Sequence, residues 1–416
     1  MSDDSLLTLV QKQTFEYFWE GAEPVSGMAR ERIHLDLHYP QNDQNVVTLG
    51  GSGFGVMAIL VGIERGFITR DQALKRYEKI TDYLAKADRF HGAWPHWLVG
   101  ETGKVRPFSK KDDGGDLVET AFMIQGLLTV AEYFKDGNQE EQKLVATINK
   151  LWGEVEWDWY TQGGKSVLFW HWSPNFGWAM NFPVGGYNEC LVMYVLAASS
   201  PTHPIEPDVY HKGWALDGNI AKDTVYYGLN TVLNFYQHNN DPTGPLFWAH
   251  YSYLGLNPKG LSDRYADYWK LNRNQTMINY RYVLDNPKGY KGYGEKQWGL
   301  TASYSMNGYA GHQPGKQDLG VISPTAALSS FPYSPKESMR FLKYLYNEAD
   351  SLVGKYGPYD AYSQTKNWCL PRYLAIDQGP IPVMIENYRS GLLWKLFMKN
   401  EDVQKGLKIL GFSISK

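Results

Sequence analysis

The segment DLVETAFMIQGLLTVAEYF, residues 116–134, is apolar on nearly every face when it is read as a helix. No charged residue interrupts it between Glu119 and Glu132, and a Gly-rich loop leads into it. A helix that is apolar all round is expected in the centre of a large protein, where other helices bury it on every side. The segment therefore predicts an inner helix of an all-α fold.

The same arrangement, a Gly- or Pro-containing loop followed by an apolar segment, recurs along the chain. Between these segments lie amphipathic stretches with one charged face, which are typical of outer helices. Six inner helices alternating with outer ones predict an all-α fold, a single (α/α)6 barrel that forms one domain over residues 1–416. Repeats of unequal length and long loops disfavour the alternative, an α-solenoid. The other expected inner helices are 48–66, 185–199, 298–307, 323–330 and 382–399, and the expected outer helices are 70–87, 139–157, 222–236, 335–353 and 401–410.

The composition excludes several classes of protein. The formal net charge is -3, and the sequence has no basic stripe that would bind nucleic acid or an anionic membrane. We find no run of about 18 apolar residues and expect no membrane span. Cys190 and Cys369 show no paired spacing, so we expect free thiols. Aromatic residues make up 15% of the chain; some of these rings must be exposed, and flat rings with polar edges suit the C–H faces of sugars.

The sequence KKDDGGDLVET, residues 110–120, carries the strongest local signal for chemistry. Asp116 and Glu119 are three residues apart at a helix start and share one face, toward which Asp112 can fold from the loop. Carboxyls this close raise one another's pKa, while the helix N-terminus favours the ionised form of the first. The cluster can therefore hold both protonated and ionised carboxyls, which acid/base chemistry needs. Helix capping by Asp116 beside a solvated acidic loop is the alternative, and for Asp113 we expect a structural role.

The letters DDGGD at residues 112–116 also fit the DDxxD pattern with which terpene synthases bind magnesium and diphosphate on an all-helical fold. In those enzymes the pattern lies along a helix, whereas Gly114 and Gly115 would break one here, and we find no second metal motif. The histidines near aromatic residues lack His-x-x-x-His spacing, so we expect neither a metal nor another cofactor. These histidines are His91, His96, His171 and His250.

Two further carboxyl residues stand where a Gly-rich loop enters an apolar helix. Glu189 in GGYNECLV, residues 185–192, should lie just inside its helix, where burial without a cation would raise its pKa and make it a candidate general acid. A capping role is the alternative for this glutamate. Asp377 lies in the Gly/Pro loop before the last inner helix and is a candidate for contact with sugar or water. Glu386, one turn inside that helix, is expected to form a structural ion pair with Arg389.

Several long loops are rich in aromatic residues and too irregular for regular elements. Loops on a rigid scaffold are where binding sites concentrate. In a ring of inner helices these loops would gather at one end and form the walls of a cleft. The candidates for stacking on sugar rings are Trp94, Trp97, Trp170, Trp172, Tyr187 and Trp248.

Most of the chain, from the helix FEYFW at residues 15–19 to residue 394, resembles the bacterial “putative glucoamylase” family of glycoside hydrolases, which includes endo-β-1,2-glucanases and sophorooligosaccharide-releasing enzymes. The resemblance implies an (α/α)6 barrel, inverting hydrolysis of β-1,2-linked glucan and a place in the bacterial cell envelope. It also implies active-site carboxylates at Asp112, Asp116, Glu119 and Glu189, with Asp377 as a further matching position. The motifs that carry it are GGSGFG at 50–55, DLVETAFMIQGLL at 116–128, GGYNE at 185–189 and IDQGPIPVMIENYRSG at 376–391.

Within this resemblance, we expect Glu189 to protonate the glycosidic oxygen, with Glu119 as the second candidate, while Asp112 or Asp116 positions a water. The expected partner is an oligo- or polysaccharide. We expect a monomer in the periplasm or cell envelope, with the export signal missing from this sequence. Three alternatives stay open: a non-catalytic glycan-binding protein, a sugar epimerase that uses histidine bases, and a lyase.

Overall fold

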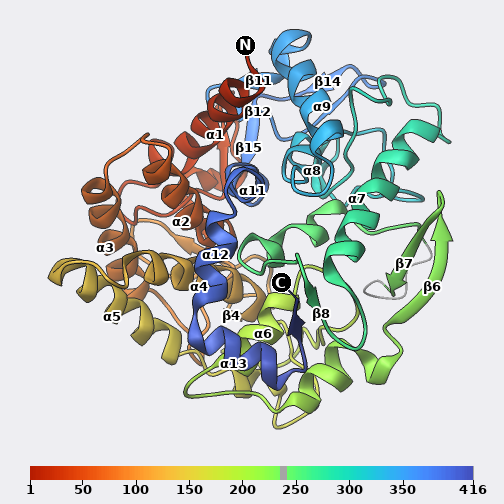
Figure 1. The fold of residues 1–416 in the computed structure, drawn as a ribbon. Coiled ribbons are helices and arrows are strands. Elements are labelled where there is room, and N and C mark those ends of the chain that lie inside the picture. The colour runs from red at the N-terminus through yellow and green to blue at the C-terminus, as the bar shows by residue number, and fades with distance from the viewer. Residues whose placement is uncertain (235–240, 416) are drawn as a thin grey trace.

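The computed structural model describes residues 1–234 and 241–415. From its red N-terminus to the light-blue α9 the chain runs around a ring of helices, and the dark-blue helices α11, α12 and α13 then run across the middle of the view toward the bottom (Figure 1). The first helix packs against α9 and α11, so the ring closes on itself. The helices are α1 (Asp3–Trp19), α2 (Leu49–Glu64), α3 (Arg70–Lys86), α4 (Leu117–Phe134), α5 (Gln139–Gly153), α6 (Leu191–Ser199), α7 (Tyr268–Asp285), α8 (Pro324–Leu328), α9 (Pro335–Asn347), α10 (Ala375–Gln378), α11 (Pro380–Arg389), α12 (Leu392–Lys399) and α13 (Glu401–Ile409).

The strands of the described residues are short and form two-stranded antiparallel pairs that connect loops rather than a central sheet. The pairs are β1 (Arg32–His34) with β15 (Arg372–Leu374), β2 (Val46–Thr48) with β3 (Trp97–Val99), β4 (Gly115–Asp116) with β5 (His171–Trp172), β6 (Ala221–Tyr226) with β7 (Leu229–Leu233), β8 (Leu261–Ser262) with β16 (Ser413–Ile414), β9 (Ser303–Ser305) with β10 (Gly308–Ala310), β11 (Val353–Gly354) with β12 (Gly357–Pro358), and β13 (Tyr362–Ser363) with β14 (Trp368–Cys369).

Helices α2 and α4 form the centre of the packing, and glycines let their backbones approach closely. A Cβ atom at Gly126 would lie 2.2 Å from the carbonyl oxygen of Gly53, and one at Gly53 would lie 2.4 Å from that of Phe122. Neither position therefore tolerates a side chain. Every residue from Leu117 to Ala131 of α4 is buried, as the sequence predicted for an inner helix. The apolar core that these helices anchor extends from Leu6 to Phe412.

By length and composition alone, α4 is long and apolar enough to cross a membrane. However, 89% of its apolar window is buried inside the fold, which is the environment of a core helix.

Several predicted helices are confirmed, and two are wrong. Residues 222–234 of the predicted outer helix 222–236 form most of the β6–β7 hairpin, and its last two residues lie outside the described part of the chain. The segment 298–307 contains β9 instead of an inner helix. The sequence KDTVYYGLNTVL is rich in β-branched and aromatic residues on both sides of Gly228, whose positive φ of 74° suits a tight turn. That enrichment, a signal for strands, was available in the sequence.

Helix α7 was not predicted because its exposed face is polar and its apolar residues are broken up by asparagines. Its buried face nevertheless includes Asn272, Asn274 and Asn279. The side chain of Asn279 pairs with the backbone of Leu300, donating to its oxygen at 3.0 Å and accepting from its nitrogen at 3.1 Å. Buried amides that satisfy loop backbone groups thus replace apolar residues in this helix, and hydrophobic periodicity does not detect them.

Candidate active site

Asp116 is the N-cap of α4 and is completely buried. Its Oδ1 accepts a hydrogen bond from the backbone nitrogen of Glu119 at 2.8 Å. The carboxylate of Glu119 in turn accepts from the backbone nitrogen of Gly50, at the start of α2, at 2.5 Å. A Cβ at Gly50 would lie 2.4 Å from Glu119 Oε2, so only glycine allows this approach. The GGSGFG segment and the acidic cluster are therefore parts of one site.

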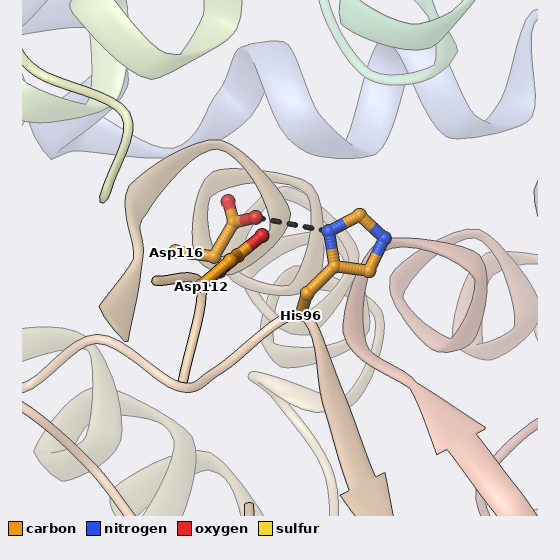
Figure 2. A group of neighbouring side chains, drawn as sticks. All are labelled: His96, Asp112 and Asp116. Carbon is orange, nitrogen blue, oxygen red and sulfur yellow. Dashed lines mark hydrogen bonds and ion pairs between the residues drawn. The ribbon is translucent and has the colours of Figure 1, made fainter. Parts of the chain in front are cut away.

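Two histidines that the sequence analysis set aside lie beside the aspartates. The Nδ1 of His96 is 3.1 Å from Asp116 Oδ2, and the second ring nitrogen of His96 points away from both aspartates (Figure 2). His171 reaches the same place from β5, with its Nε2 3.5 Å from Asp112 Oδ2 and 4.0 Å from Asp116 Oδ2. Pairing of β4 with β5 sets His171 opposite Asp116, which explains how a distant loop delivers this side chain.

The pKa values in this cluster diverge, as the sequence predicted for close carboxyls. Burial, reinforced by the charge of Asp116, raises the pKa of Asp112 to about 7. Burial also raises the pKa of Glu119 to about 8. For Asp116, burial would raise the pKa, but the hydrogen bond and charge of His96 outweigh it and lower the pKa. Burial opposes the charged form of His96, yet Glu119, Asp116 and Glu31 together raise its pKa to about 10.

Glu189 lies in the turn that leads into α6, two residues before the helix begins at Leu191, rather than inside the helix as predicted. Asn188 Oδ1 accepts from the backbone nitrogen of Cys190 at 2.9 Å and shapes this turn. No cation is hydrogen-bonded to Glu189 in the described structure, and burial raises its pKa to about 7. Near neutral pH this carboxyl therefore exists in both the protonated and the ionised form.

A cavity of about 260 Å³ connects the parts of this site. Glu119 and Glu189 both line it, together with Glu31 and His96. Its volume is close to the lower end of the roughly 300–1,000 Å³ typical of pockets for drug-sized ligands, so a longer glycan would have to extend beyond it. The aromatic residues of the lining are Trp97, Phe108, Phe122, Trp170, Phe247, Tyr251, Tyr304 and Tyr309.

The predicted stacking residues divide into two groups. Trp97 and Trp170 line the cavity, and Trp172 and Trp248 are partly exposed, so these four stay candidates. Trp94 is fully buried and donates its indole N–H to the carbonyl of Leu84. Tyr187 is 1% exposed, and its hydroxyl donates to Asn272 at 2.9 Å. Because Trp94 and Tyr187 have no free face for a sugar, we assign them to the core.

Asp377 does not line the cavity but lies behind its wall. The hydroxyl of Tyr251, a lining residue, donates to Asp377 Oδ1 at 3.4 Å. Asp360, a second buried carboxyl, interacts with Asp377, and its Oδ2 accepts a hydrogen bond from the backbone nitrogen of Tyr304 at 2.7 Å. Burial, followed by the charge of Asp360, raises the pKa of Asp377 far above its usual range, whereas the pKa of Asp360 is raised only to about 6. Near neutral pH the pair therefore holds one proton, on Asp377, and supports the wall from behind, so we no longer expect direct sugar contact for Asp377.

Three other expectations have definite outcomes. The ion pair between Glu386 and Arg389 is wrong: Glu386 accepts two hydrogen bonds of 2.7 Å from Arg65, and Arg389 pairs with Asp4. Asp113 has the structural role predicted for it, because it accepts hydrogen bonds from Ser173 and Asn175 in the loop before α6. The two cysteines are free, as predicted.

His96, Asp112 and Asp116 could hold a metal ion by residue type, because one ligand atom from each lies within 4.8 Å of the others. However, His96 Nδ1 and Asp116 Oδ2 are hydrogen-bonded to each other. The sequence analysis set aside His96 and His171 and did not name Glu31 or Asp360, because none of these residues carries a motif.

Comparison with known proteins gives concordant matches. Residues 181–401 match the family model described as “Putative glucoamylase”. A solved endo-β-1,2-glucanase from Chitinophaga pinensis, in complex with sophorotriose and glucose, is 63% identical, with 99% of each chain covered and a TM-score of 0.98. An exo β-1,2-glucooligosaccharide sophorohydrolase from Parabacteroides distasonis is 45% identical over 98% of this chain, and this chain spans 58% of that protein's length.

A more distant likeness concerns the fold alone. An endo-β-1,2-glucanase from Talaromyces funiculosus has 8% sequence identity to this chain but a TM-score of 0.65. The matches confirm the predicted all-α (α/α)6-barrel class.

Proposed function

Since the chain belongs to the family described as “Putative glucoamylase”, we propose that it is a glycoside hydrolase that cleaves β-glucosidic bonds in β-1,2-glucan or sophorooligosaccharides. The single observation that carries the proposal is the cavity that Glu119 and Glu189 share with aromatic side chains. Two carboxyls with pKa values of about 8 and about 7 suit the exchange of protons at neutral pH. The names of two similar proteins, a β-1,2-glucanase and a sophorohydrolase, support the linkage.

In this mechanism Glu189 is the general acid that protonates the glycosidic oxygen. It is the better candidate because Glu119 already accepts a hydrogen bond from the backbone of Gly50. Asp112, whose pKa of about 7 leaves part of it ionised near neutral pH, would then activate the attacking water. Such a pair acts by inversion when the two carboxyls are roughly 6.5–9.5 Å apart and leave room for that water. Because an acid must be protonated to act, activity should fall as the pH rises through the pKa of Glu189, about 7.

The test is incubation of the purified protein with β-1,2-, β-1,3-, β-1,4- and α-linked glucans, with products separated by chromatography. The proposal expects release of short sophorooligosaccharides or sophorose from the β-1,2 polymer only. NMR of the first product then gives the stereochemistry: inversion yields the α-anomer, whereas early β-anomer would show retention. Absence of cleavage of every glucan, with tight binding of one, would instead indicate a glycan-binding protein.

A sugar epimerase that uses histidine bases is less well supported. His96 lines the cavity, but an imidazole whose pKa is about 10 is protonated at neutral pH and cannot serve as a base. A lyase product would absorb in the ultraviolet, so the same incubations distinguish that alternative.

We also propose that the protein acts as a monomer in the periplasm or cell envelope. A polymeric glucan is met outside the cytoplasm, which supports this location. Cell fractionation of the source bacterium and light scattering of the purified chain would test the two points separately.

A further inference from the structure

Asp116 has no access to a substrate, although its motif marks it as an active-site carboxylate. Its side chain is 0% exposed. Both of its oxygens are engaged, Oδ1 by the backbone nitrogen of Glu119 and Oδ2 by His96. The second contact leads directly to the cavity, because His96 is 22% exposed and is one of the lining residues, whereas Asp116 is not.

His96 is held in a defined orientation. Its ring lies 4.3 Å from that of Phe108 and stands perpendicular to that of Trp97, at 5.7 Å. With Nδ1 bonded to Asp116, the remaining donor is Nε2, which points away from the aspartates (Figure 2). No hydrogen bond within the described part of the chain engages Nε2. An oriented, unused N–H donor at the wall of a largely aromatic cavity is a means of binding an oxygen atom of a ligand.

We propose that His96 is the group that contacts the glycan at this end of the cavity, and that Asp116 is a positioning residue that affects glycan binding only through His96. The proposal rests on the proposed glycoside hydrolase function and reassigns one of its carboxylates. Carboxylate–histidine pairs fix the orientation of an imidazole and stabilise its charged form. The raised pKa of His96 is in accord with this role.

The charge of His96 limits which atom of the glycan it can contact. The transition state of glycoside hydrolysis resembles an oxocarbenium ion, with positive charge at the anomeric carbon. A cation beside that carbon would oppose the reaction. We therefore assign the Nε2–H of His96 to a sugar hydroxyl or to the leaving-group oxygen. The ionisable groups that face His96 are Glu31, Asp112, Asp116, Glu119 and His171.

The first experiment compares H96A, D116N and the double variant on β-1,2-glucan. A hydrogen bond to a charged donor is worth roughly 10- to 100-fold in affinity, so H96A should lower kcat/KM by that factor, mainly through KM. D116N keeps the helix cap, because asparagine caps as well as aspartate. If Asp116 affects glycan binding only through His96, D116N added to H96A causes no further rise in KM. A further large rise in KM in the double variant would overturn the proposal.

The second experiment observes His96 itself by NMR of the imidazole protons in wild type and D116N. In wild type the ring should stay protonated beyond pH 8, and D116N should move its titration toward neutrality. The KM of D116N should then rise between pH 6 and pH 8, while that of wild type stays flat. An unchanged His96 titration in D116N would overturn the proposal, even if activity fell.

Controls separate this proposal from its alternatives. His203 forms a similar pair with Asp158, at 3.3 Å, on the surface, so H203Q should leave kcat/KM unchanged. Thermal unfolding of each variant reports on folding. Loss of wild-type activity in EDTA, restored by Zn²⁺, would show that His96 is a metal ligand and would overturn the proposal. If wild type cleaves no glucan, the proposed function fails, whereas the NMR titration still tests the His96–Asp116 pair.

Discussion

The two ends of α2 both lie at hollows lined by charged residues, but the charges are arranged in opposite ways. At the start of α2 is the cavity of about 260 Å³, whose Glu119 and Glu189 have no cation from residues 1–234 or 241–415 hydrogen-bonded to them. Near its end is an open groove of about 1,130 Å³ lined by Arg65, Asp3 and Asp4, among others. The helix has 16 residues, so about 24 Å separates the two ends.

In the groove the charges neutralise each other. Arg65 pairs with Glu386, Arg389 with Asp4, and Lys343 with Asp3. Burial alone would raise the pKa of Glu386, but hydrogen bonds from Arg65 and Ser390 outweigh it and lower the pKa. Glu189 is also buried, but without such partners its pKa rises to about 7. The larger hollow is therefore a structural surface, and the smaller one, where burial raises the pKa of both glutamates, is the proposed active site.

The largest effect that this comparison predicts is the loss of turnover in E189Q. Glutamine has the shape of glutamic acid but cannot donate a proton to the glycosidic oxygen. Loss of a general acid lowers the rate by roughly 10²- to 10⁴-fold, so kcat on β-1,2-glucan should fall by that factor. The measurement is the initial rate of reducing-end formation at pH 6, with circular dichroism to check the fold. Turnover close to wild type would show that Glu189 is not the acid.

At the other end of α2, R65M should change stability rather than activity. Removal of the arginine leaves Glu386, whose side chain is 2% exposed, as an unpaired buried charge. Breaking such a pair costs about 3–5 kcal/mol in the free energy of unfolding. Denaturant unfolding measures this loss, and kcat should stay near wild type.

Two further variants test that explanation. R340M removes an arginine that is 43% exposed and paired with Glu295, so it should cost less than about 1 kcal/mol. The double variant R65M/E386Q should recover part of the stability, because no buried charge is left. If R65M loses as little unfolding free energy as R340M, the contrast between the two ends of α2 is wrong.

The pH dependence of stability should also test the raised pKa of Glu189. In the unfolded chain Glu189 loses its proton near its ordinary pKa of 4.5, whereas in the folded protein it keeps the proton up to about 7. The folded state therefore binds more protons between these values, so stability falls as the pH rises from about 4.5 to about 7.

E189Q has no such proton and should gain stability relative to wild type across that window, by on the order of 3 kcal/mol at pH 8. Unfolding of both proteins in urea at pH 5 and pH 8 gives this difference. If the difference in unfolding free energy between E189Q and wild type is the same at pH 5 and pH 8, the pKa of Glu189 is not raised in the folded protein.

The sequence predicted the helices of the protein better than the residues of its site. Apolar helices such as α4 were identified because their composition reports burial directly. Glu119 and Glu189 were found because each follows a Gly-rich loop at the start of such a helix. Glu31 and His96 were not assigned to the site, since short strand pairings bring them to the cavity wall and no local spacing encodes those pairings.

The lack of a local signal for distant contacts also explains why the sequence analysis predicted the wrong ion-pair partner for Glu386. Spacing of three residues on one helix favours Arg389, but Arg65 lies 321 positions away in sequence and makes two hydrogen bonds with Glu386. A local pattern gives candidates for a contact, and tertiary packing decides among them.

The smallest predicted effects concern two adjacent residues, Asp112 and Asp113. Asp113 accepts hydrogen bonds from Ser173 and Asn175, whereas Asp112 Oδ1 is buried without a hydrogen-bond partner among the described residues. D113N should therefore cost only about 1 kcal/mol of unfolding free energy, through one weakened hydrogen bond, with kcat unchanged. D112N should leave stability unchanged or raise it, because a buried carboxyl whose pKa is about 7 gains from neutral replacement, while it lowers kcat. Urea unfolding and initial rates on β-1,2-glucan measure both variants side by side, and a larger loss of kcat in D113N than in D112N would reverse the assignment of these neighbours.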